Sequence, residues 1–343
     1  TYIEYGYFVF AVFAVCTLLY VNKSRGHVVC LVIAMFVFFS AALPLCSVWL
    51  MNDFPYVAFS SVPGFLLPAG LALCYNRIYK LPLGVPTLYD FSARLVPSAL
   101  GTVTSFFLLL EALAYVPASF VAILRSTGCV FAVLLALAFG LNFHTSLIPP
   151  MIVLATGTVL TAAEQTDFSW VGLVLTLASN FSMAAAGVLM QMFMTKTRLG
   201  SQREYDQVTT YFWSSICYGV IMLAETLIVD GLEPFRFLVG MDASQWHACL
   251  PKLLVQWSLT ASLTYAKIFV IRDLGAVTDQ VVVISAGIFT VCGGIVFFGE
   301  IVTILQFVGY AVVLGGFAWY CYVKNTIHQM SEDEDPLKNK VAT

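Results

Sequence analysis

The segment Leu124-Arg125-Ser126-Thr127-Gly128 recurs in altered form as Val283-Ile284-Ser285-Ala286-Gly287. The two serines are 159 residues apart (285 − 126 = 159). The same offset relates three further pairs without a gap: Phe139-Gly140 and Phe298-Gly299, Val153 and Val312, and Gly157 and Gly316. We therefore infer an internal repeat, in which two similar halves follow one another along the chain.

Composition places both halves in a membrane. Of the 343 residues, 60% are hydrophobic and 10% are charged, whereas a soluble domain has about 25% charged residues. Each crossing of a bilayer needs about 20 mostly apolar residues, because the backbone must satisfy its own hydrogen bonds in hydrocarbon. The net charge is −3 and no long basic run occurs, so nucleic acid is not an expected partner. The lipid bilayer is an expected partner.

Apolar runs predict eleven transmembrane helices. The first, at 5–21, is followed by Lys23 and Arg25, whereas a signal peptide has its basic residues before the apolar stretch. We therefore predict an extra N-terminal transmembrane helix. The ten runs that follow are 28–51, 54–75, 95–115, 117–141, 147–163, 168–192, 208–229, 250–271, 276–298 and 301–322.

The repeat predicts how these ten helices are related. Five runs separate matching helices, and an odd number reverses the direction through the membrane, so the halves have inverted topology, as in many transporters. The predicted fold is an all-α membrane protein, a ten-helix inverted-repeat (5+5) transporter bundle. The predicted parts are 1–26 (extra helix and linker), 27–166 (first five-helix repeat), 167–324 (second repeat) and 325–343 (tail with acidic and basic residues). Most basic residues outside the spans fall on one side, which is predicted to be cytosolic.

Residues that often carry catalysis or bind metal are scattered. The nine cysteines form no CxxC pair, and the four histidines fall at or outside the ends of the predicted spans. The chain contains no HExxH and no GxSxG motif. We expect no metal, no cofactor and no enzymatic activity.

Two junctions resemble a known family. Residues 112–120 (Ala-Leu-Ala-Tyr-Val-Pro-Ala-Ser-Phe), followed by Leu124-Arg125-Ser126, resemble the junction of the third and fourth spans in the drug/metabolite transporter superfamily. Residues 269–281 (Phe-Val-Ile-Arg-Asp-Leu-Gly-Ala-Val-Thr-Asp-Gln-Val) resemble the junction of the eighth and ninth spans in its triose-phosphate/nucleotide-sugar translocator branch, as does Phe54-Pro55-Tyr56. The resemblance covers residues 28–322. It implies a Golgi or endoplasmic reticulum membrane protein, with the plastid inner envelope or another organelle membrane as the alternative.

The resemblance also implies binding residues. In this branch a basic residue in the fourth span and a lysine in the ninth bind the phosphate or nucleotide part of the substrate. Arg125 matches the first position, but Ala286 stands where the second would lie, and Ser47-Val48 replaces an Asn-Lys pair that often precedes Phe-Pro-Tyr. Because a desolvated dianion normally needs more than one cation, a less anionic substrate is an alternative.

Arg125 is the principal candidate for binding substrate. It lies eight residues after Pro117, roughly 12 Å into the bilayer at a rise of about 1.5 Å per residue, and charges at such depth are usually functional. The alternative is a structural ion pair with Glu111 of the preceding span. Glu111 is also a candidate for proton coupling.

Five further residues have both a functional and a structural interpretation. Ser126 and Ser285 either bind substrate hydroxyls across the axis of the repeat or permit close helix packing. Asn180 and Tyr211 either offer a polar and stacking surface to a sugar or base, or belong to the core. Lys267 either faces the central cavity or extends to water at the cytosolic end of its helix.

Asp279, within Thr278-Asp279-Gln280, is predicted to cap the start of the ninth helix.

The leading functional hypothesis is an antiporter-like secondary transporter that moves a small organic metabolite, such as a nucleotide sugar or a sugar phosphate, by alternating access. Two alternatives stay open. One is a drug or amino-acid-like metabolite exporter of the same superfamily, and the other is a non-transporting membrane subunit. The expected partners are a small-molecule substrate and a second copy of the chain or a larger membrane complex.

Overall fold

The computed structural model describes residues 25–80, 83–117, 120–121, 124–141, 144–162, 169–195, 204–284, 286–287 and 303–333. These residues form helices and no strand. Three predicted features lie outside them: the leading helix at 5–21, residue Ser285, and the part of the ninth span from 288 to 298.

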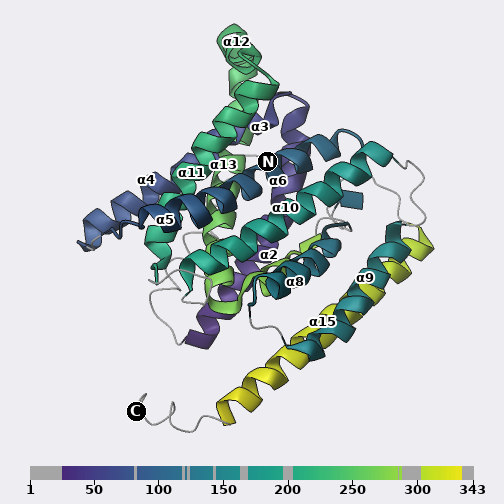
Figure 1. The fold of residues 1–343 in the computed structure, drawn as a ribbon. Coiled ribbons are helices and arrows are strands. Elements are labelled where there is room, and N and C mark those ends of the chain that lie inside the picture. The colour runs from purple at the N-terminus through teal and green to yellow at the C-terminus, as the bar shows by residue number, and fades with distance from the viewer. Residues whose placement is uncertain are drawn as a thin grey trace.

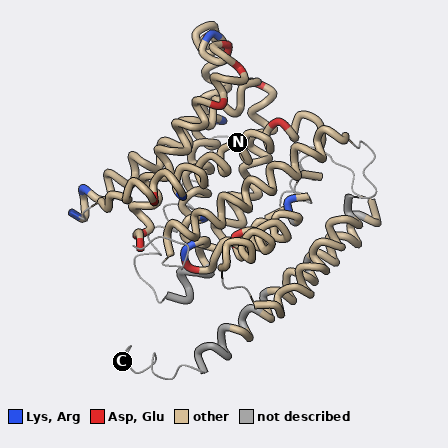
Figure 2. The backbone as a smooth tube through the Cα atoms, in the orientation of Figure 1, with Lys and Arg blue, Asp and Glu red and all other residues tan. Residues whose placement is uncertain are grey.

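The long helices fall on the predicted apolar runs (Figure 1). Within the described residues, six helical segments are long and apolar enough to cross a membrane, so the chain is a multi-pass membrane protein. The helices are α2 (Arg25–Met51), α3 (Val57–Ser60), α4 (Val62–Tyr79), α5 (Leu88–Asp90), α6 (Val96–Leu113), α8 (Gly128–Ala138), α9 (Ile148–Ala162), α10 (Trp170–Met194), α11 (Gln207–Val229), α12 (Glu233–Gly240), α13 (Ala243–Leu274) and α15 (Ile304–Asp333), with a π-helical turn η1 (Phe91–Leu95) and two 3₁₀ turns, η2 (Arg125–Thr127) and η3 (Thr145–Leu147). Figure 2 shows long stretches of these helices without a charged residue.

The three longest extensions beyond the predicted limits occur where polar residues begin or continue a helix. Helical structure before α6 starts at Leu88, where the Thr87 hydroxyl caps the backbone N–H of Asp90. Helix α13 starts at Ala243 with a capping box formed by Asp242 and Gln245. Helix α15 continues to Asp333, into the predicted tail. Hydropathy alone does not predict these helix ends, because they lie in polar sequence outside the apolar runs.

The helices pack in a regular set of pairs. The most extensive contacts join α6 with α10, α9 with α15, α4 with α11, and α2 with α13. Two further pairs, α6 with α11 and α4 with α13, make contacts of equal extent. In Figure 1, α9 and α15 run side by side along one edge of the bundle.

Glycines bring α9 and α15 into backbone contact. A Cβ atom on Gly157 would lie 2.8 Å from the backbone nitrogen of Val313, and one on Gly316 would lie 3.0 Å from that of Leu154. The contact on α15 moves back from Gly316 to Val313 as the contact on α9 moves forward from Leu154 to Gly157, so the helices are antiparallel. Such close approach is typical of small residues at membrane helix interfaces.

Small polar residues join α6 and α10 in a similar way. The Ser98 hydroxyl donates to the carbonyl of Ala186 over 2.8 Å, and the Ser179 hydroxyl donates to the carbonyl of Ser105 over 2.7 Å. A Cβ atom on Gly101 would lie 3.0 Å from the carbonyl oxygen of Ser182. This interface fixes the position of α10, which carries residues of the site described below.

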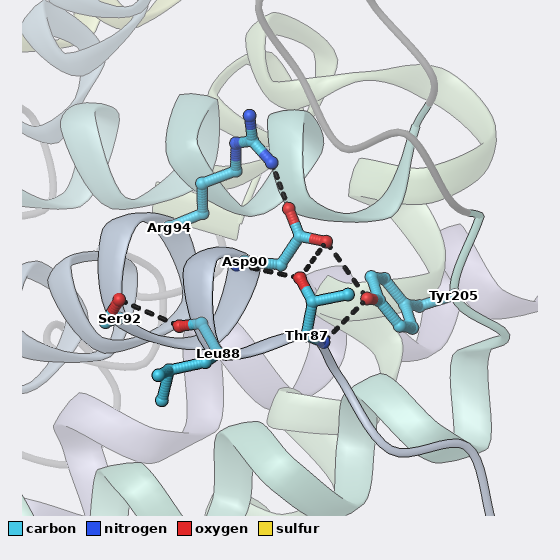
Figure 3. A network of polar contacts seen from close by, with 6 residues as sticks. All are labelled: Thr87, Leu88, Asp90, Ser92, Arg94 and Tyr205. Atoms are coloured by element: carbon cyan, nitrogen blue, oxygen red, sulfur yellow. Dashed lines mark hydrogen bonds and ion pairs between the residues drawn. The ribbon is translucent and has the colours of Figure 1, made fainter.

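A polar cluster that we call the Arg94 clasp ties the start of α6 to the segment before α11 (Figure 3). The carboxylate of Asp90 pairs with Arg94 and accepts hydrogen bonds from the hydroxyls of Thr87 (2.8 Å) and Tyr205 (3.0 Å). The Tyr205 ring stacks on Phe193, with 4.6 Å between ring centroids. Both carboxylate oxygens of this buried acid therefore have partners.

A second cluster, the Lys252 clasp, joins the end of α2 to the start of α13. Lys252 pairs with Asp53, and its ammonium lies 4.4 Å from the centroid of the Trp49 ring. One turn further along α13, Gln256 hydrogen-bonds to the hydroxyls of Ser60 and Ser61, so this helix is also tied to α3 and the start of α4. The two clasps involve different helices. Each joins residues more than 100 positions apart in the sequence.

Candidate substrate-binding site

Arg125 lies where the fourth predicted span changes its helical geometry. The 3₁₀ turn Arg125–Thr127 precedes helix α8, and the carbonyl of Leu124 accepts hydrogen bonds from the Asn180 amide (2.7 Å) and the Thr127 hydroxyl (2.8 Å). A carbonyl freed from a regular helix needs such partners in the membrane. Asn180, predicted as a substrate contact, is buried and holds this turn against α10.

Two cations come close together at this turn without an ion-pair partner in contact. The described part of the chain offers Arg125 neither a hydrogen bond nor a carboxylate within 4 Å, and its side chain is half-buried. Lys267 of α13, also half-buried, donates to the thioether sulfur of Met183 on α10 over 2.7 Å and to no other described residue. A thioether is a weak acceptor. The two positive charges lie within electrostatic reach of each other, and an anion near both would reduce their repulsion.

Asp279 is the acid that faces both cations. It is fully buried at 0% exposure, and it lies within electrostatic reach of Lys267 and Arg125. Its Oδ2 accepts a hydrogen bond from Gln280 over 3.1 Å, whereas its Oδ1 has no hydrogen-bond partner. The prediction that Asp279 caps a helix is wrong, because its carboxylate accepts from no backbone N–H among the described residues.

Asp90 shows how unusual this environment is. Asp90 and Asp279 are both buried carboxylates, but Asp90 pairs with Arg94 and accepts from two hydroxyls. A buried charge normally has such partners, since leaving an oxygen unpaired costs about 1–3 kcal/mol or more. The unpaired oxygen of Asp279 therefore indicates a place where a further group is bound.

Glycines make room for these groups. A Cβ atom on Gly128, at the start of α8, would lie 2.7 Å from the side-chain oxygen of Gln280, the residue that donates to Asp279. A Cβ atom on Gly187 of α10 would lie 3.9 Å from Asp279 Oδ2. Tyr218 of α11 also lies within electrostatic reach of Asp279. The site thus collects residues from η2, α8, α10, α11, α13 and the helical residues 276–284.

The other predicted site residues lie apart from this group or outside what can be described. Glu111 is exposed near the end of α6, within electrostatic reach of Asp230, and no ion pair among the described residues joins it to Arg125. The Tyr211 hydroxyl donates to the carbonyl of Ala261 over 2.9 Å. The side chain of Ser126 is not described, and Ser285 lies outside the described residues.

Sequence reasoning missed Asp279 as a site residue, although one signal was present. A charged residue close to an apolar run is a candidate for function as well as for a cap. The described residues contain no cluster of three or more His, Cys, Asp or Glu side chains that could hold a metal ion.

The fold and the site together define a class: a multi-pass helical membrane protein with opposed charges buried between helices from both halves of the chain. A profile of the Triose-phosphate Transporter family matches residues 27–321. The chain belongs to this family, which confirms the resemblance to the triose-phosphate branch of the drug/metabolite transporter superfamily.

Three similar proteins of Arabidopsis thaliana are each described as a probable sugar phosphate/phosphate translocator. The first is 26% identical over 261 residues, which cover 73% of this chain and 61% of that protein. The others are 22% identical (78% and 77% covered) and 21% identical (87% and 90% covered). The chain thus spans about three fifths of the length of the first relative. A crystal structure of another protein has the same fold, with a TM-score of 0.54, 12% identity, and coverage of 89% of this chain and 99% of the other.

Proposed function

We propose that this protein is a secondary carrier that exchanges a sugar phosphate for inorganic phosphate across an organelle membrane. The observation that carries the proposal is the pair Arg125 and Lys267, two half-buried cations that have no carboxylate in contact among the residues that the structure describes. A phosphoryl group that leaves water needs several charged donors to replace its hydration. The two cations come from different helical segments, η2 and α13, and supply two such donors.

Lys267 also answers the difficulty raised by the sequence. Ala286 stands at the ninth-span position where the resemblance to the translocator branch implies a basic residue, which left Arg125 as the single cation at a position that the branch uses for binding. Lys267 comes from the preceding helix and brings a second positive charge within electrostatic reach of Arg125. This arrangement favours a phosphorylated substrate over the drug or amino-acid-like exporter.

Helix packing supports an inverted repeat and, with it, alternating access. In the proposed repeat, the counterparts are α2 and α10, α4 and α11, α6 and α13, and α9 and α15. Exchanging each helix for its counterpart turns the pair of α6 and α10 into the pair of α13 and α2, and it leaves the pairs of α4 with α11 and of α9 with α15 unchanged. These four are the most extensive helix pairs among the described residues. The antiparallel contact of Gly157 and Gly316 has the same property. Two such halves can rock about a central site and open it to either side in turn.

Counterflow tests the proposal. Liposomes that contain the purified protein and unlabelled phosphate should take up labelled phosphate, and external glucose 6-phosphate should compete. Removing a charged hydrogen-bonding group costs about 1.5–3 kcal/mol, so Arg125→Ala and Lys267→Ala should each lower the apparent affinity about tenfold or more. Arg272→Ala, at an exposed position on the same helix as Lys267, is the matched control.

Three results would reject the proposal: no phosphate counterflow by the wild type, normal counterflow by both variants, or an equal loss in Arg272→Ala. Competition by a nucleotide sugar but not by glucose 6-phosphate would instead assign the carrier to nucleotide sugars.

A further inference from the structure

Charge balance at the site leads to an inference that rests on the proposed function. Arg125 and Lys267 carry one positive charge each and Asp279 carries one negative charge, so the empty site has a net charge of +1 when all three are ionised. A monoanion brings the sum to zero. A dianion brings it to −1, and an uncompensated charge buried in the membrane is strongly disfavoured.

Asp279 is the group in the site that can remove this excess. It is fully buried, and its Oδ1 has no hydrogen-bond partner, so a proton can be added there without breaking a hydrogen bond that the structure contains. The bond from Gln280 goes to the other oxygen. The groups that face Asp279 from neighbouring elements are Lys267 on α13, Arg125 on η2 and Tyr218 on α11; the adjacent α10 residue Gly187 has no charge.

A dianion between Arg125 and Lys267 changes the surroundings of Asp279 in one direction. In the empty site, the attraction of both cations stabilises the Asp279 carboxylate. The dianion competes with Asp279 for these cations, and it adds negative charge nearby. Both changes favour the protonated acid. A protonated carboxyl also gains an O–H group that can donate to a phosphoryl oxygen.

We propose that Asp279 is the proton-binding residue of the carrier and takes up one proton when a dianionic phosphoryl group binds. The proton comes from water, forms the O–H bond on the Asp279 carboxylate, and returns to water when the dianion leaves. Each half-cycle with a dianion therefore moves a proton in the same direction as the substrate. A half-cycle with a monoanion moves none.

Sulfate is the probe that isolates this effect, because it stays a dianion from weakly acidic to weakly basic pH, whereas a phosphate ester titrates near pH of about 6. Purified protein in weakly buffered detergent solution is mixed with sulfate while an indicator dye reports proton uptake, and binding is measured by calorimetry. If one proton is bound per sulfate, affinity falls about tenfold per pH unit once Asp279 is ionised in the empty site.

The comparison is made with Asp279→Asn, which has the same shape and cannot titrate, and with Asp273→Asn, which removes an exposed acid at the end of α13. Wild type and Asp273→Asn should take up close to one proton per sulfate, and Asp279→Asn should take up none and bind with an affinity that does not change with pH. If Asp279→Asn does not fold, the proton count of the wild type decides.

Sulfate binding without proton uptake by the wild type, or equal uptake by Asp279→Asn, would overturn the proton site and leave the carrier function intact. Failure of the wild type to bind either sulfate or phosphate would overturn the proposed function and this inference together.

Discussion

At the scale of single residues, the contacts that position Lys267 and Arg125 do not neutralise their positive charges. Lys267 rests on the sulfur of Met183, and the turn that carries Arg125 is fixed through its backbone. Neither contact neutralises a cation. The charges are therefore positioned by neighbours of low polarity or by main-chain hydrogen bonds, and they remain available to an anion.

Gly128 provides a test of how Asp279 is positioned. In Gly128→Ala, the new methyl group would displace the Gln280 side chain, because they would lie 2.7 Å apart. The end of a glutamine moves easily, so we expect a small change in melting temperature but a several-fold change in phosphate affinity as the bond from Gln280 to Asp279 is lost. Gly70→Ala, where nothing lies within 4 Å, is the control and should leave phosphate affinity unchanged. Unaltered affinity in Gly128→Ala would show that Gln280 does not position Asp279.

Asn180 provides a test of how Arg125 is positioned. Asn180→Ala leaves the Leu124 carbonyl with one donor in place of two, and the loss of a buried hydrogen bond costs about 1–3 kcal/mol. We expect a lower melting temperature and weaker phosphate binding, because the turn that presents Arg125 loosens. Ser258→Ala removes an exposed hydroxyl that bonds within its own helix and should change neither. If Asn180→Ala binds phosphate normally, Asn180 has a structural role only.

The residue scale is also where prediction from the sequence was weakest. The depth of Arg125 in the membrane was estimated from its distance to Pro117, and its role as a substrate-binding charge stays a prediction. Which way Lys267 faces could not be read from the sequence, since that depends on the rotation of α13 against α10. Asp279 was misassigned because Thr-Asp-Gln at a helix start has the local pattern of a cap, and its partners lie on other helices.

At the scale of helices, the sequence was a better guide. The predicted runs locate the long helices because a bilayer requires long apolar segments whatever their tertiary contacts are. Short or polar elements were missed, including α12, the first turn of α13 and the 3₁₀ turn at Arg125. The positions of these elements are determined by caps and by contacts between helices, which a hydropathy average does not detect. The number of spans and their inverted relation remain part of the proposal.

The crossing of α9 and α15 yields a prediction for these elements. Gly157→Leu and Gly316→Leu each push a side chain into the backbone of the opposite helix, and overpacking of this kind costs about 1–3 kcal/mol or more. Both variants should lower the melting temperature by similar amounts, since the two contacts correspond. Gly315→Leu, one position away and facing open space, should have little effect. Dissimilar losses would argue against the symmetry of the crossing.

At the scale of the whole molecule, the two clasps are polar contacts that link segments far apart in the chain. The Arg94 clasp joins Asp90 to Tyr205, and the Lys252 clasp joins Asp53 to Lys252. Each links a residue of the predicted first half to one of the second. In an alternating-access carrier, contacts of this kind must open in turn.

Thiol labelling can detect such an opening. Cys46 and Cys249 are buried and lie within electrostatic reach of Lys252. Asp53→Asn weakens the Lys252 clasp and should accelerate the reaction of these two thiols with a membrane-impermeant maleimide, as mapped by mass spectrometry. Glu233→Gln breaks a different ion pair, within the neighbouring helix α12, and should not. Equal labelling in both variants and the wild type would mean that the Lys252 clasp does not control access.

The antiparallel crossing of α9 and α15 has a consequence for the chemistry of the site. A contact in which each helix presents equivalent residues to the other is what a two-fold dimer of half-length chains would make. In such a dimer every charge would occur twice. Within a single chain the matching positions can differ: at the offset of 159, the counterparts of Arg125, Lys267 and Asp279 are Ile284, Leu108 and Phe120. A single chain can therefore carry an acid at one of two matching positions and an apolar residue at the other, whereas two identical half-length chains would have the same residue at both.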